Sequence, residues 1–416
     1  MPMKIRRRIA IDVLLVLFLI FAPHAVVSAA DFEEVGAPRE IKGGPGAYRI
    51  YEQTYQATLG KSPFDKIALH RVFKVEPAHL GEGVPQLHRA SEPVSIVLYL
   101  PGTNMNGEVA LEDPRYSFQV YLAEHGANVW AMDYRTHFIP PQTPQSDLSE
   151  LAGWTNELFE SDIDAAAKFV SEKSGRDKLF VAGFSRGVEF AYLCAARHPD
   201  RVAGIIALDG FIPTHPMRAA PVTAGHYADD IGGEHLTYDK RYKLMQMVID
   251  NPDQPAPIPK YKTARENLEH VVYGAGGFFG GNGGLANPQG GFSDAVVLAK
   301  LLIGYDRYWP AVQDGENPFS AELLAALKAS KIPVIAFAST NFGSQWPGQV
   351  EAAAKSTGAP DPSFKKFDNW GHLDVLAGTK SESEVFAPTV AWIKQHQKWA
   401  DTEGRRGAVE RGGLAE

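Results

Sequence analysis

Cysteine is almost absent from this sequence of 416 residues, which contains only Cys194. One thiol cannot form a disulfide within the chain, so the fold must depend on a buried core, which a chain of this length can supply. Cys194 lies in the segment GVEFAYLCAARH, whose pattern is typical of a helix. We therefore expect it to be a small buried residue and not a nucleophile.

Basic residues are also fewer than acidic residues. The chain has 41 Lys and Arg residues against 49 Asp and Glu residues, and its formal net charge is −8 at pH 7. Nucleic acids are bound by basic surfaces, so this balance excludes them as expected partners.

Metal-binding motifs are lacking too. No H-E-x-x-H motif occurs, and the candidate ligands in the middle of the chain are too widely spread to form a set: His215, His226, Asp229, Asp230 and His235. The Gly-rich segment 274–291 does not follow a buried strand and lacks Gly-Lys-Ser, so it predicts a flexible lid and not a phosphate site. We expect neither a metal nor another cofactor.

Only one long apolar run is present, at residues 13–21. It follows the basic segment 4–8 and precedes Ser28, Ala29 and Ala30. This three-part pattern is typical of a secretory signal peptide cleaved after Ala30, and the run is short for a membrane span. An uncleaved N-terminal anchor is the alternative. We expect an exported protein, periplasmic or extracellular, without a membrane span in its mature form.

The rest of the chain alternates between two kinds of pattern. Apolar runs typical of strands occur at 48–59, 66–75, 94–100, 127–135, 178–185, 202–210, 332–340 and 363–368. Segments typical of helices occur at 115–126, 157–175, 186–198, 320–331, 348–358 and 383–400. Strands that alternate with helices of this length predict an α/β fold with a mostly parallel sheet and helices on both faces.

This alternation is interrupted at residues 211–317, which are rich in proline and glycine. A long irregular stretch inside a compact fold is uncommon unless it is functional, so we expect a cap or lid inserted after the sixth strand. A disordered decoration is the alternative. The prediction divides the chain into core segments at 31–210 and 318–400, the cap between them, and a frayed tail at 401–416.

A G-x-S-x-G motif occurs at Gly183-Phe184-Ser185-Arg186-Gly187, where a buried strand meets a helix. A serine on such a tight turn projects its hydroxyl above the sheet, and the flanking positions must be small. We expect Ser185 to be a nucleophile and the backbone N–H of Arg186 to face a developing oxyanion. A turn serine without a chemical role is the alternative.

A serine nucleophile needs a general base. C-terminal to the insertion only His372 and His396 remain, and His396 lies on the polar face of the last predicted helix. His372 stands in the segment NWGHLDVL, a loop just after the last predicted strand. We therefore expect His372 to be the base.

With these motifs in place, the chain resembles the α/β-hydrolase family over residues 45–210 and 318–398, and LHRVFKV and WGHLD are similar to its acid-lipase branch. The resemblance implies Ser185 as the nucleophile, His372 as the base and an oxyanion hole with two N–H donors. One donor is Arg186. By position the second is Thr103 in the loop PGTNMNG, with the neighbouring Asn104 as the other option. Asn104 is also a candidate substrate contact.

The acid of the triad has two candidate positions. Most family members carry it after the strand at 332–340, but here Asn341 follows and no carboxylate occurs before Glu351. Others carry it after the sixth strand, where Asp209 stands at a carboxyl end. We favour Asp209, with a simple Asp-Gly turn as the alternative. Two further aspartates, Asp374 and Asp133, are expected to order their own loops.

The predicted function is hydrolysis of a carboxylic ester, small or lipid-like, through a Ser-His-Asp triad and an acyl-enzyme. An amidase or acyltransferase on the same scaffold and a non-catalytic binding protein of this fold are the alternatives. Haloalkane and epoxide chemistry would need a carboxylate at position 185. The side chain of Arg186 has two candidate partners, a substrate carboxylate or a neighbour on its helix.

Overall fold

The computed structural model describes residues 30–41, 48–75, 95–216, 237–273 and 293–397. The predicted signal peptide, apart from Ala30, lies outside these ranges, as do the Gly-rich segment and the predicted tail. Within the described ranges, no helix combines the length and the apolar character that crossing a bilayer requires.

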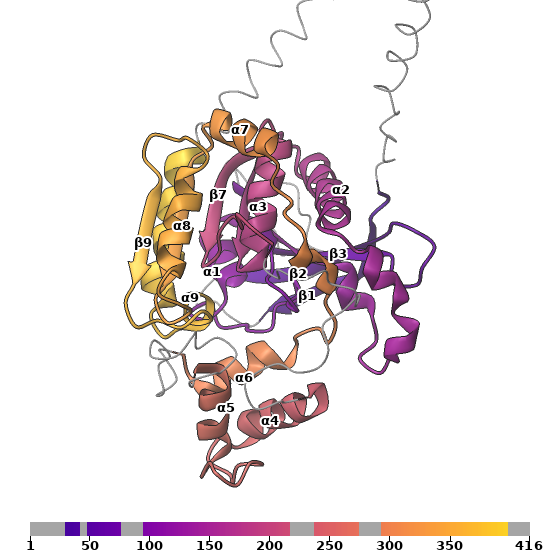
Figure 1. The fold of residues 1–416 in the computed structure, drawn as a ribbon, viewed down its shortest axis with the longest axis vertical. Helices are drawn as coiled ribbons and strands as arrows, with labels where there is room; N and C mark the ends of the chain where they lie inside the picture. The colour runs from indigo at the N-terminus through magenta and orange to yellow at the C-terminus, as the bar shows by residue number, and fades with distance from the viewer. Residues whose placement is uncertain (1–29, 42–47, 76–94, 217–236, 274–292, 398–416) are drawn as a thin grey trace, which may run out of the picture.

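A nine-stranded sheet runs through the described part of the chain in the order β1-β2-β3-β5-β4-β6-β7-β8-β9 (Figure 1). Its strands are β1 (Glu33–Ile41), β2 (Arg49–Thr58), β3 (Lys66–Val75), β4 (Ser95–Leu100), β5 (Ala127–Asp133), β6 (Leu179–Phe184), β7 (Val202–Leu208), β8 (Val334–Ser339) and β9 (Ser363–Phe367). The pairs β1-β2, β2-β3 and β3-β5 are antiparallel. The pairs from β5 through β4 to β9 are all parallel, so the mostly parallel sheet is confirmed.

Helices cover both faces of this sheet, and a further group lies beyond one end of it. The helices of the described residues are α1 (Phe118–Glu124), α2 (Asn156–Ser174), α3 (Arg186–Arg197), α4 (Tyr238–Asp250), α5 (Ala264–Tyr273), α6 (Ala295–Ile303), α7 (Ala321–Ser330), α8 (Trp346–Lys355) and α9 (Asp374–Ala377). A π-helical turn at Glu382–Phe386 leads into a last helix at 387–397. The α/β architecture predicted from the alternating patterns is therefore confirmed.

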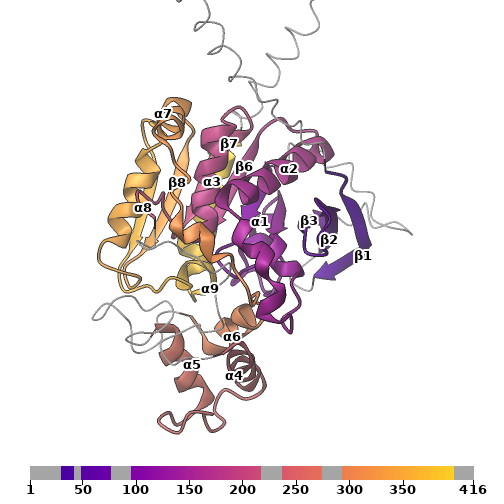
Figure 2. The same cartoon turned by 45° about the vertical axis from the view of Figure 1, so that its right-hand side comes forward.

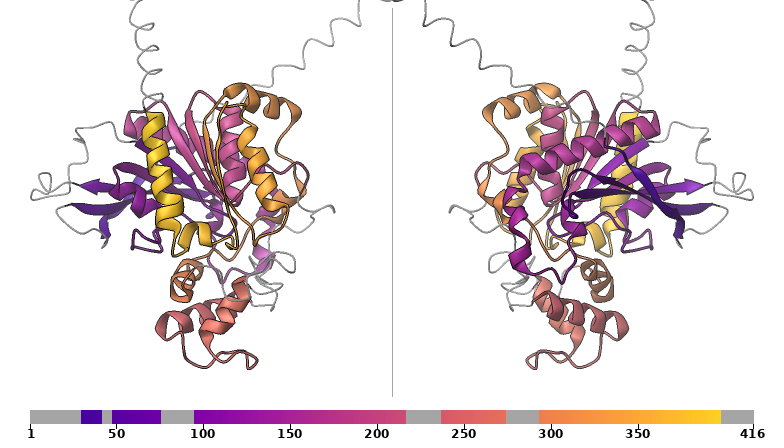
Figure 3. Two further views of the ribbon diagram at one scale, coloured as in Figure 1. Left: turned by 90° about the vertical axis from the view of Figure 1, so that its left-hand side faces the viewer. Right: turned by 90° about the vertical axis from the view of Figure 1, so that its right-hand side faces the viewer.

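Successive residues of β4 show how the two faces are separated. Val97 and Tyr99 pack into the apolar layer beneath α1 and the last helix. Leu98 and Leu100 point the other way, into the layer beneath α2, α3 and α8. Figure 3 shows the last helix and α3 on opposite sides of the strands. The central strands are buried on both faces, which explains their continuous apolar sequences.

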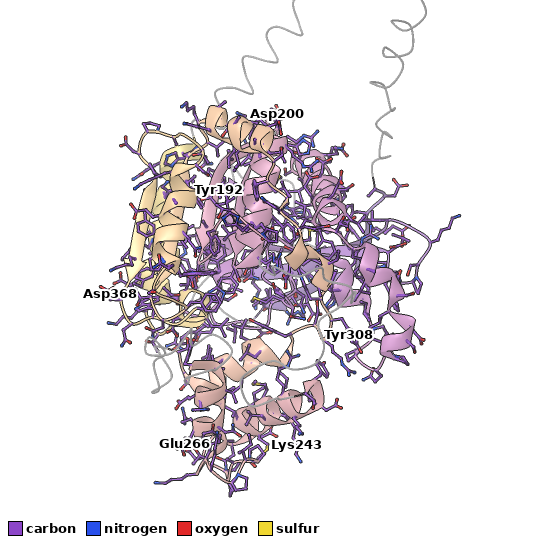
Figure 4. The ribbon with its side chains drawn as sticks, in the orientation of Figure 1. Tyr192, Asp200, Lys243, Glu266, Tyr308 and Asp368 are labelled. Atoms are coloured by element: carbon purple, nitrogen blue, oxygen red, sulfur yellow. The ribbon has the colours of Figure 1, made fainter. Side chains whose placement is uncertain are left out.

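The helices α4, α5 and α6 come from the region 211–317 and form a group beyond one end of the sheet (Figures 1 and 2). The loop that follows the carboxyl end of β4 is hydrogen-bonded to Asp306, just after α6. The carboxyl ends of the parallel strands therefore lie on this side of the molecule. Lys243 and Glu266 lie at the outer end of this group, whereas Tyr308 lies close to the sheet (Figure 4). The group is therefore attached at the edge where ligands of open α/β sheets bind.

One strand has no counterpart in the sequence prediction. The strand β1 has the sequence EEVGAPREI, and all but two of its residues are exposed. It therefore lacks the alternation of apolar and polar residues by which strands are recognised. It is held by its antiparallel pairing with β2, with an irregularity between Val35 and Arg39. Because of β1, the sixth predicted strand is β7 of the sheet.

Candidate active site

Ser185 occupies the sharp turn between β6 and α3, with φ 54° and ψ −119°. This conformation is strained for a residue with a side chain, and such strain persists where surrounding contacts enforce it. The N–H of Ser185 donates to the carbonyl of Leu208 at 3.0 Å, and its own carbonyl accepts from Val188 at 3.0 Å. The turn places a half-buried serine at the carboxyl end of the sheet.

The two glycines of the motif are required by close backbone contacts. A Cβ at Gly187 would lie 1.9 Å from the carbonyl oxygen of Leu100, and one at Gly183 would lie 2.2 Å from that of Gly187. No side chain fits at either position. The sequence prediction that these positions must be small therefore agrees with the packing.

His372 lies in the loop between β9 and α9 and is fully buried. Its Nδ1 is 2.6 Å from Oδ2 of Asp209, which assigns the other ring nitrogen, Nε2, as the one available for proton transfer. The preceding residue, Gly371, packs closely against α5. A Cβ there would lie 2.1 Å from the ring of Tyr273, so this glycine makes room for the end of α5.

The imidazole of His372 is surrounded by aromatic rings. Phe342 stacks on it with ring centroids 4.2 Å apart and an interplanar angle of 9°. Phe184 lies at 4.6 Å, and Trp346 meets the imidazole edge-on at 5.6 Å and 89°. These rings restrict the imidazole to one orientation.

Asp209 follows β7 with φ 54° and is fully buried. Besides His372, its carboxylate accepts the backbone N–H of Ser339 at 2.7 Å, the hydroxyl of Ser339 at 2.6 Å and the indole N–H of Trp346 at 2.9 Å. A Cβ at the next residue, Gly210, would lie 2.3 Å from the carbonyl oxygen of Ser185. The Asp-Gly pair therefore permits a close approach to the serine turn while presenting the carboxylate to the histidine.

The other candidates for the acid have different partners. Asn341 donates its backbone N–H to Trp370, and its side-chain amide approaches Asn369 at 3.4 Å. The carboxylate of Asp374 accepts from the N–H of Gly371 at 2.7 Å and from two hydroxyls, of Tyr273 at 3.0 Å and of Ser293 at 2.6 Å. Asp374 thus orders the histidine loop, as expected, and also ties it to α5 and to the start of α6.

The loop after β4 passes directly beside the serine. A Cβ at Gly102 would lie 3.1 Å from Cβ of Ser185, and the N–H of Met105 closes a turn onto the carbonyl of Gly102 at 3.0 Å. Thr103 lies in this turn and is half-buried. Thr103 directly follows Gly102, which lies beside Ser185, and its role as the second oxyanion donor stays a prediction.

Asn104 is turned toward the helices beyond the sheet. Its backbone has φ 62°, its side-chain amide donates to the carbonyl of Asp306 at 3.0 Å, and its carbonyl accepts the N–H of Asp306 at 2.7 Å. Asp306 also lies 3.0 Å from Nδ1 of His137. Asn104 therefore fastens the loop, and its role as a substrate contact stays a prediction.

A buried charged network lies behind the same loop, and of its members the sequence analysis named only Asp133, whose partner Gly107 lies in the loop after β4 and not in the loop that follows Asp133 itself. His70 on β3 contacts Glu52 at 3.1 Å and Asp133 at 2.9 Å. Burial opposes charge on the ring, but these carboxylates outweigh it and raise the pKa of His70 to about 10. Burial likewise opposes ionisation of Asp133, yet His70 and other neighbours lower its pKa to about 2. Asp133 also accepts the N–H of Gly107 at 2.7 Å and so anchors the loop.

The side chain of Arg186 is buried and pairs with acidic groups of the protein. Its guanidinium lies 2.5 Å from Asp314 and 3.5 Å from Glu189, one turn along α3. Of the two candidate partners, the neighbour on the helix is thus present and the substrate carboxylate is not supported. The backbone N–H of Arg186 remains at the start of α3, directly after the nucleophile.

The described residues contain no group of three or more His, Cys, Asp or Glu side chains arranged to hold a metal. Several of the histidines and aspartates considered above, including His226 and His235, lie outside those residues. Cys194 is buried in α3, and burial raises the pKa of its thiol to about 12. The prediction that Cys194 is buried is confirmed, and a thiol with a raised pKa is a poor nucleophile.

Comparisons with known proteins agree with this geometry. The family described as the α/β hydrolase fold matches residues 96–230. The crystal structure of a "putative lipase" from Sulfolobus solfataricus is 26% identical with a TM-score of 0.69, over 88% of this chain and 99% of that chain. A thermophilic esterase from Thermogutta terrifontis is more distant, at 15% identity and a TM-score of 0.41, over 83% and 99%. No curated protein matches the sequence.

The strand order, the serine turn at the end of β6 and the first two of these matches point to the same conclusion. The chain belongs to the α/β-hydrolase superfamily.

Proposed function

We propose that this protein is a serine hydrolase that cleaves carboxylic esters, with Ser185 as nucleophile, His372 as general base and Asp209 as the acid. The observation that carries the proposal is the 2.6 Å contact between two fully buried groups, Nδ1 of His372 and the carboxylate of Asp209. A buried carboxylate aligned on one imidazole nitrogen directs the proton of the neutral ring to Nδ1, so that Nε2 can accept one.

The proposed reaction has two halves. In the first, Nε2 of His372 takes the hydroxyl proton while Oγ of Ser185 bonds to the ester carbonyl carbon, and the carbonyl oxygen becomes an oxyanion. The N–H groups of Arg186 and Thr103 receive that oxyanion. The tetrahedral intermediate then expels the alkoxide, which takes the proton from Nε2 and leaves an acyl-enzyme.

In the second half, water replaces the alcohol. Its proton passes to Nε2 of His372, its oxygen bonds to the acyl carbon, and the bond to Oγ of Ser185 breaks as the proton returns to the serine. Asp209 remains ionised throughout and stabilises the imidazolium in each half. The carboxylic acid is released and the enzyme is regenerated.

Ester substrates are favoured over amides by analogy with the relatives. The Sulfolobus solfataricus structure carries a lipase name, and the Thermogutta terrifontis protein is called an esterase. An amidase or acyltransferase would use the same kind of acyl-enzyme, so the products must distinguish these enzymes from an esterase. Incubation with an ester and competing alcohols or amines should yield mainly the free acid if water is the natural acceptor.

The direct test is the intact mass of the protein after reaction with a fluorophosphonate. We expect one stoichiometric adduct on the wild-type protein and none on Ser185→Ala. An adduct that persists in Ser185→Ala would locate the nucleophile elsewhere. The absence of any adduct on the wild-type protein would refute the proposed chemistry and favour a non-catalytic binding protein.

We also propose that residues 1–30 direct export. The strand β1 begins at Glu33, three residues after the expected cleavage site, so removal of these residues leaves every described element in place. Sequencing of the N-terminus of the protein purified from an exporting host should begin at Asp31. An intact N-terminus on a membrane-bound product would support the uncleaved anchor instead.

A further inference from the structure

We propose that Trp346 is a positioning residue that sets the proton affinity of His372 through Asp209. This inference rests on the proposed triad and extends it by one residue. Trp346 is the first residue of α8, and its indole N–H donates to Oδ1 of Asp209 at 2.9 Å. The indole also packs against the ring of His372, so Trp346 can act on the base through the carboxylate and through this ring contact.

The indole has a fixed orientation. Its ring meets Phe342 at 4.4 Å and 87°, Phe211 at 4.8 Å and 83°, and His372 at 5.6 Å and 89°. Edge-to-face contacts of this kind on three sides restrict rotation of the indole. The direction of its N–H is therefore determined by packing, independently of the bond that it makes.

The two oxygens of Asp209 have different environments because of this donor. Oδ1 accepts the backbone N–H of Ser339 and the indole N–H of Trp346, and neither group exchanges a proton in the proposed reaction. Oδ2 accepts the hydroxyl of Ser339 and faces Nδ1 of His372, both at 2.6 Å. Two donors on Oδ1 orient the carboxylate plane so that Oδ2 points at the histidine.

Donors to a carboxylate also determine how strongly it favours a positive neighbour. Each hydrogen bond to an ionised group stabilises the anion and reduces the negative charge that it offers to other partners. Trp346 therefore restrains the attraction between Asp209 and the imidazolium. If its N–H is removed, we expect His372 to hold its proton to a higher pH.

The test is Trp346→Phe, which keeps an aromatic ring at this position and removes the N–H. The measurement is the rate constant of fluorophosphonate labelling of Ser185 against pH, which reports the fraction of His372 in its neutral form and needs no natural substrate. The labelling rate falls toward low pH, and we call this part of the profile the acidic limb. We expect the pH at its midpoint to rise by about half a unit, a modest fraction of the energy of one hydrogen bond to a charged group. The maximal rate should fall about threefold to tenfold because the carboxylate is less well oriented.

A matched control applies the same change elsewhere. Trp392 on the last helix is buried against Phe180 and Gly204, on the other face of the sheet from α8. Trp392→Phe should lower the unfolding temperature and leave the acidic limb where the wild-type protein has it. A second variant, Ser339→Ala, removes a donor from Oδ2 and should move the limb in the same direction as Trp346→Phe.

The outcomes separate this inference from the proposed function. If Ser185 is labelled in Trp346→Phe and the midpoint of the acidic limb is the same as in the wild-type protein, the role of Trp346 is overturned and the triad is left intact. The same holds if only the maximal rate is slower. Equal limb shifts in Trp346→Phe and Trp392→Phe would also overturn it, because the effect would then be one of general stability. If the wild-type protein is not labelled, the proposed function and this inference both fail.

Discussion

Replacing Asp209 by asparagine tests the triad directly, because the change removes a charge and keeps the shape of the side chain. The hydrogen bonds around Asp209 determine how the new amide would sit. Oδ1 accepts two fixed donors, the backbone N–H of Ser339 and the indole of Trp346, so an amide NH₂ cannot occupy that position without two unfavourable contacts. The NH₂ must therefore take the place of Oδ2.

At the Oδ2 position the NH₂ faces the hydroxyl of Ser339 and Nδ1 of His372. The serine hydroxyl can rotate and accept, but Nδ1 can accept only if it carries no proton. The neutral imidazole is then protonated on Nε2, the nitrogen that should receive the proton of Ser185. We expect kcat to fall on the order of 10⁴-fold, the loss seen when a triad carboxylate becomes an amide and the histidine takes the wrong tautomer.

The assay is the steady-state hydrolysis of a chromogenic short-chain ester, with the rate of fluorophosphonate labelling measured on the same preparations. Asp374→Asn is the matched control, since Asp374 is a second fully buried aspartate, two residues from His372, with different partners. We expect it to lower stability with a far smaller loss of kcat. A near-wild-type rate in Asp209→Asn would refute the assignment, and the role of orienting His372 would then pass to Asn341 or Asp374.

Three further predictions concern stability. Gly187→Ala should lower the free energy of unfolding by about 3 kcal/mol, because the new methyl would meet a β4 carbonyl oxygen at 1.9 Å. Gly304→Ala is its control and should change the free energy of unfolding by less than about 0.5 kcal/mol, because no atom lies within 4 Å of the new methyl. Asp314→Asn should cost about 3 kcal/mol, since it leaves the buried Arg186 without its nearest anion. His70→Gln should be less stable than the wild-type protein below pH 6.5, and the difference should shrink as pH rises toward 10, because a raised folded-state pKa stabilises the protonated form.

Urea unfolding monitored by tryptophan fluorescence measures all three. Equal midpoints for Gly187→Ala and Gly304→Ala would contradict the close approach of α3 to β4. A wild-type midpoint for Asp314→Asn would mean that Glu189, 3.5 Å from the guanidinium, suffices as a partner. For His70→Gln, a difference that is constant between pH 6 and pH 10 would show that the ring is not charged in the folded protein.

The candidate nucleophile and the candidate base could be proposed from the sequence because their signals are local or sequential. Ser185 stands between glycines at the junction of an apolar run and a helix pattern, and each of these features is visible in adjacent residues. His372 was one of only two histidines C-terminal to the insertion. The structure brings His372 to Asp209 at 2.6 Å, which is consistent with His372 as the proposed base.

The partners of Asp209 could not be predicted in the same way. Ser339 and Trp346 lie 130 and 137 positions from Asp209, and neither stands in a motif. The pairing of Arg186 with Asp314, 128 positions away, gave no signal either. The contacts of Asp209 arise only when β7, β8 and α8 are packed side by side, and the pair of Arg186 and Asp314 arises only when α3 packs against the segment Ala311–Gly315.

The sequence by itself determined the alternation of strands and helices and the serine turn, because these depend on periodicity and on backbone constraints within a few residues. The tertiary structure decided which carboxylate faces His372, where the guanidinium of Arg186 lies and what surrounds the imidazole. It also added β1, whose exposed residues carry no apolar pattern and whose place depends on pairing with β2. Hydrogen bonds and ring contacts between distant segments have no periodic trace in a sequence, since they exist only once the core has brought those segments together.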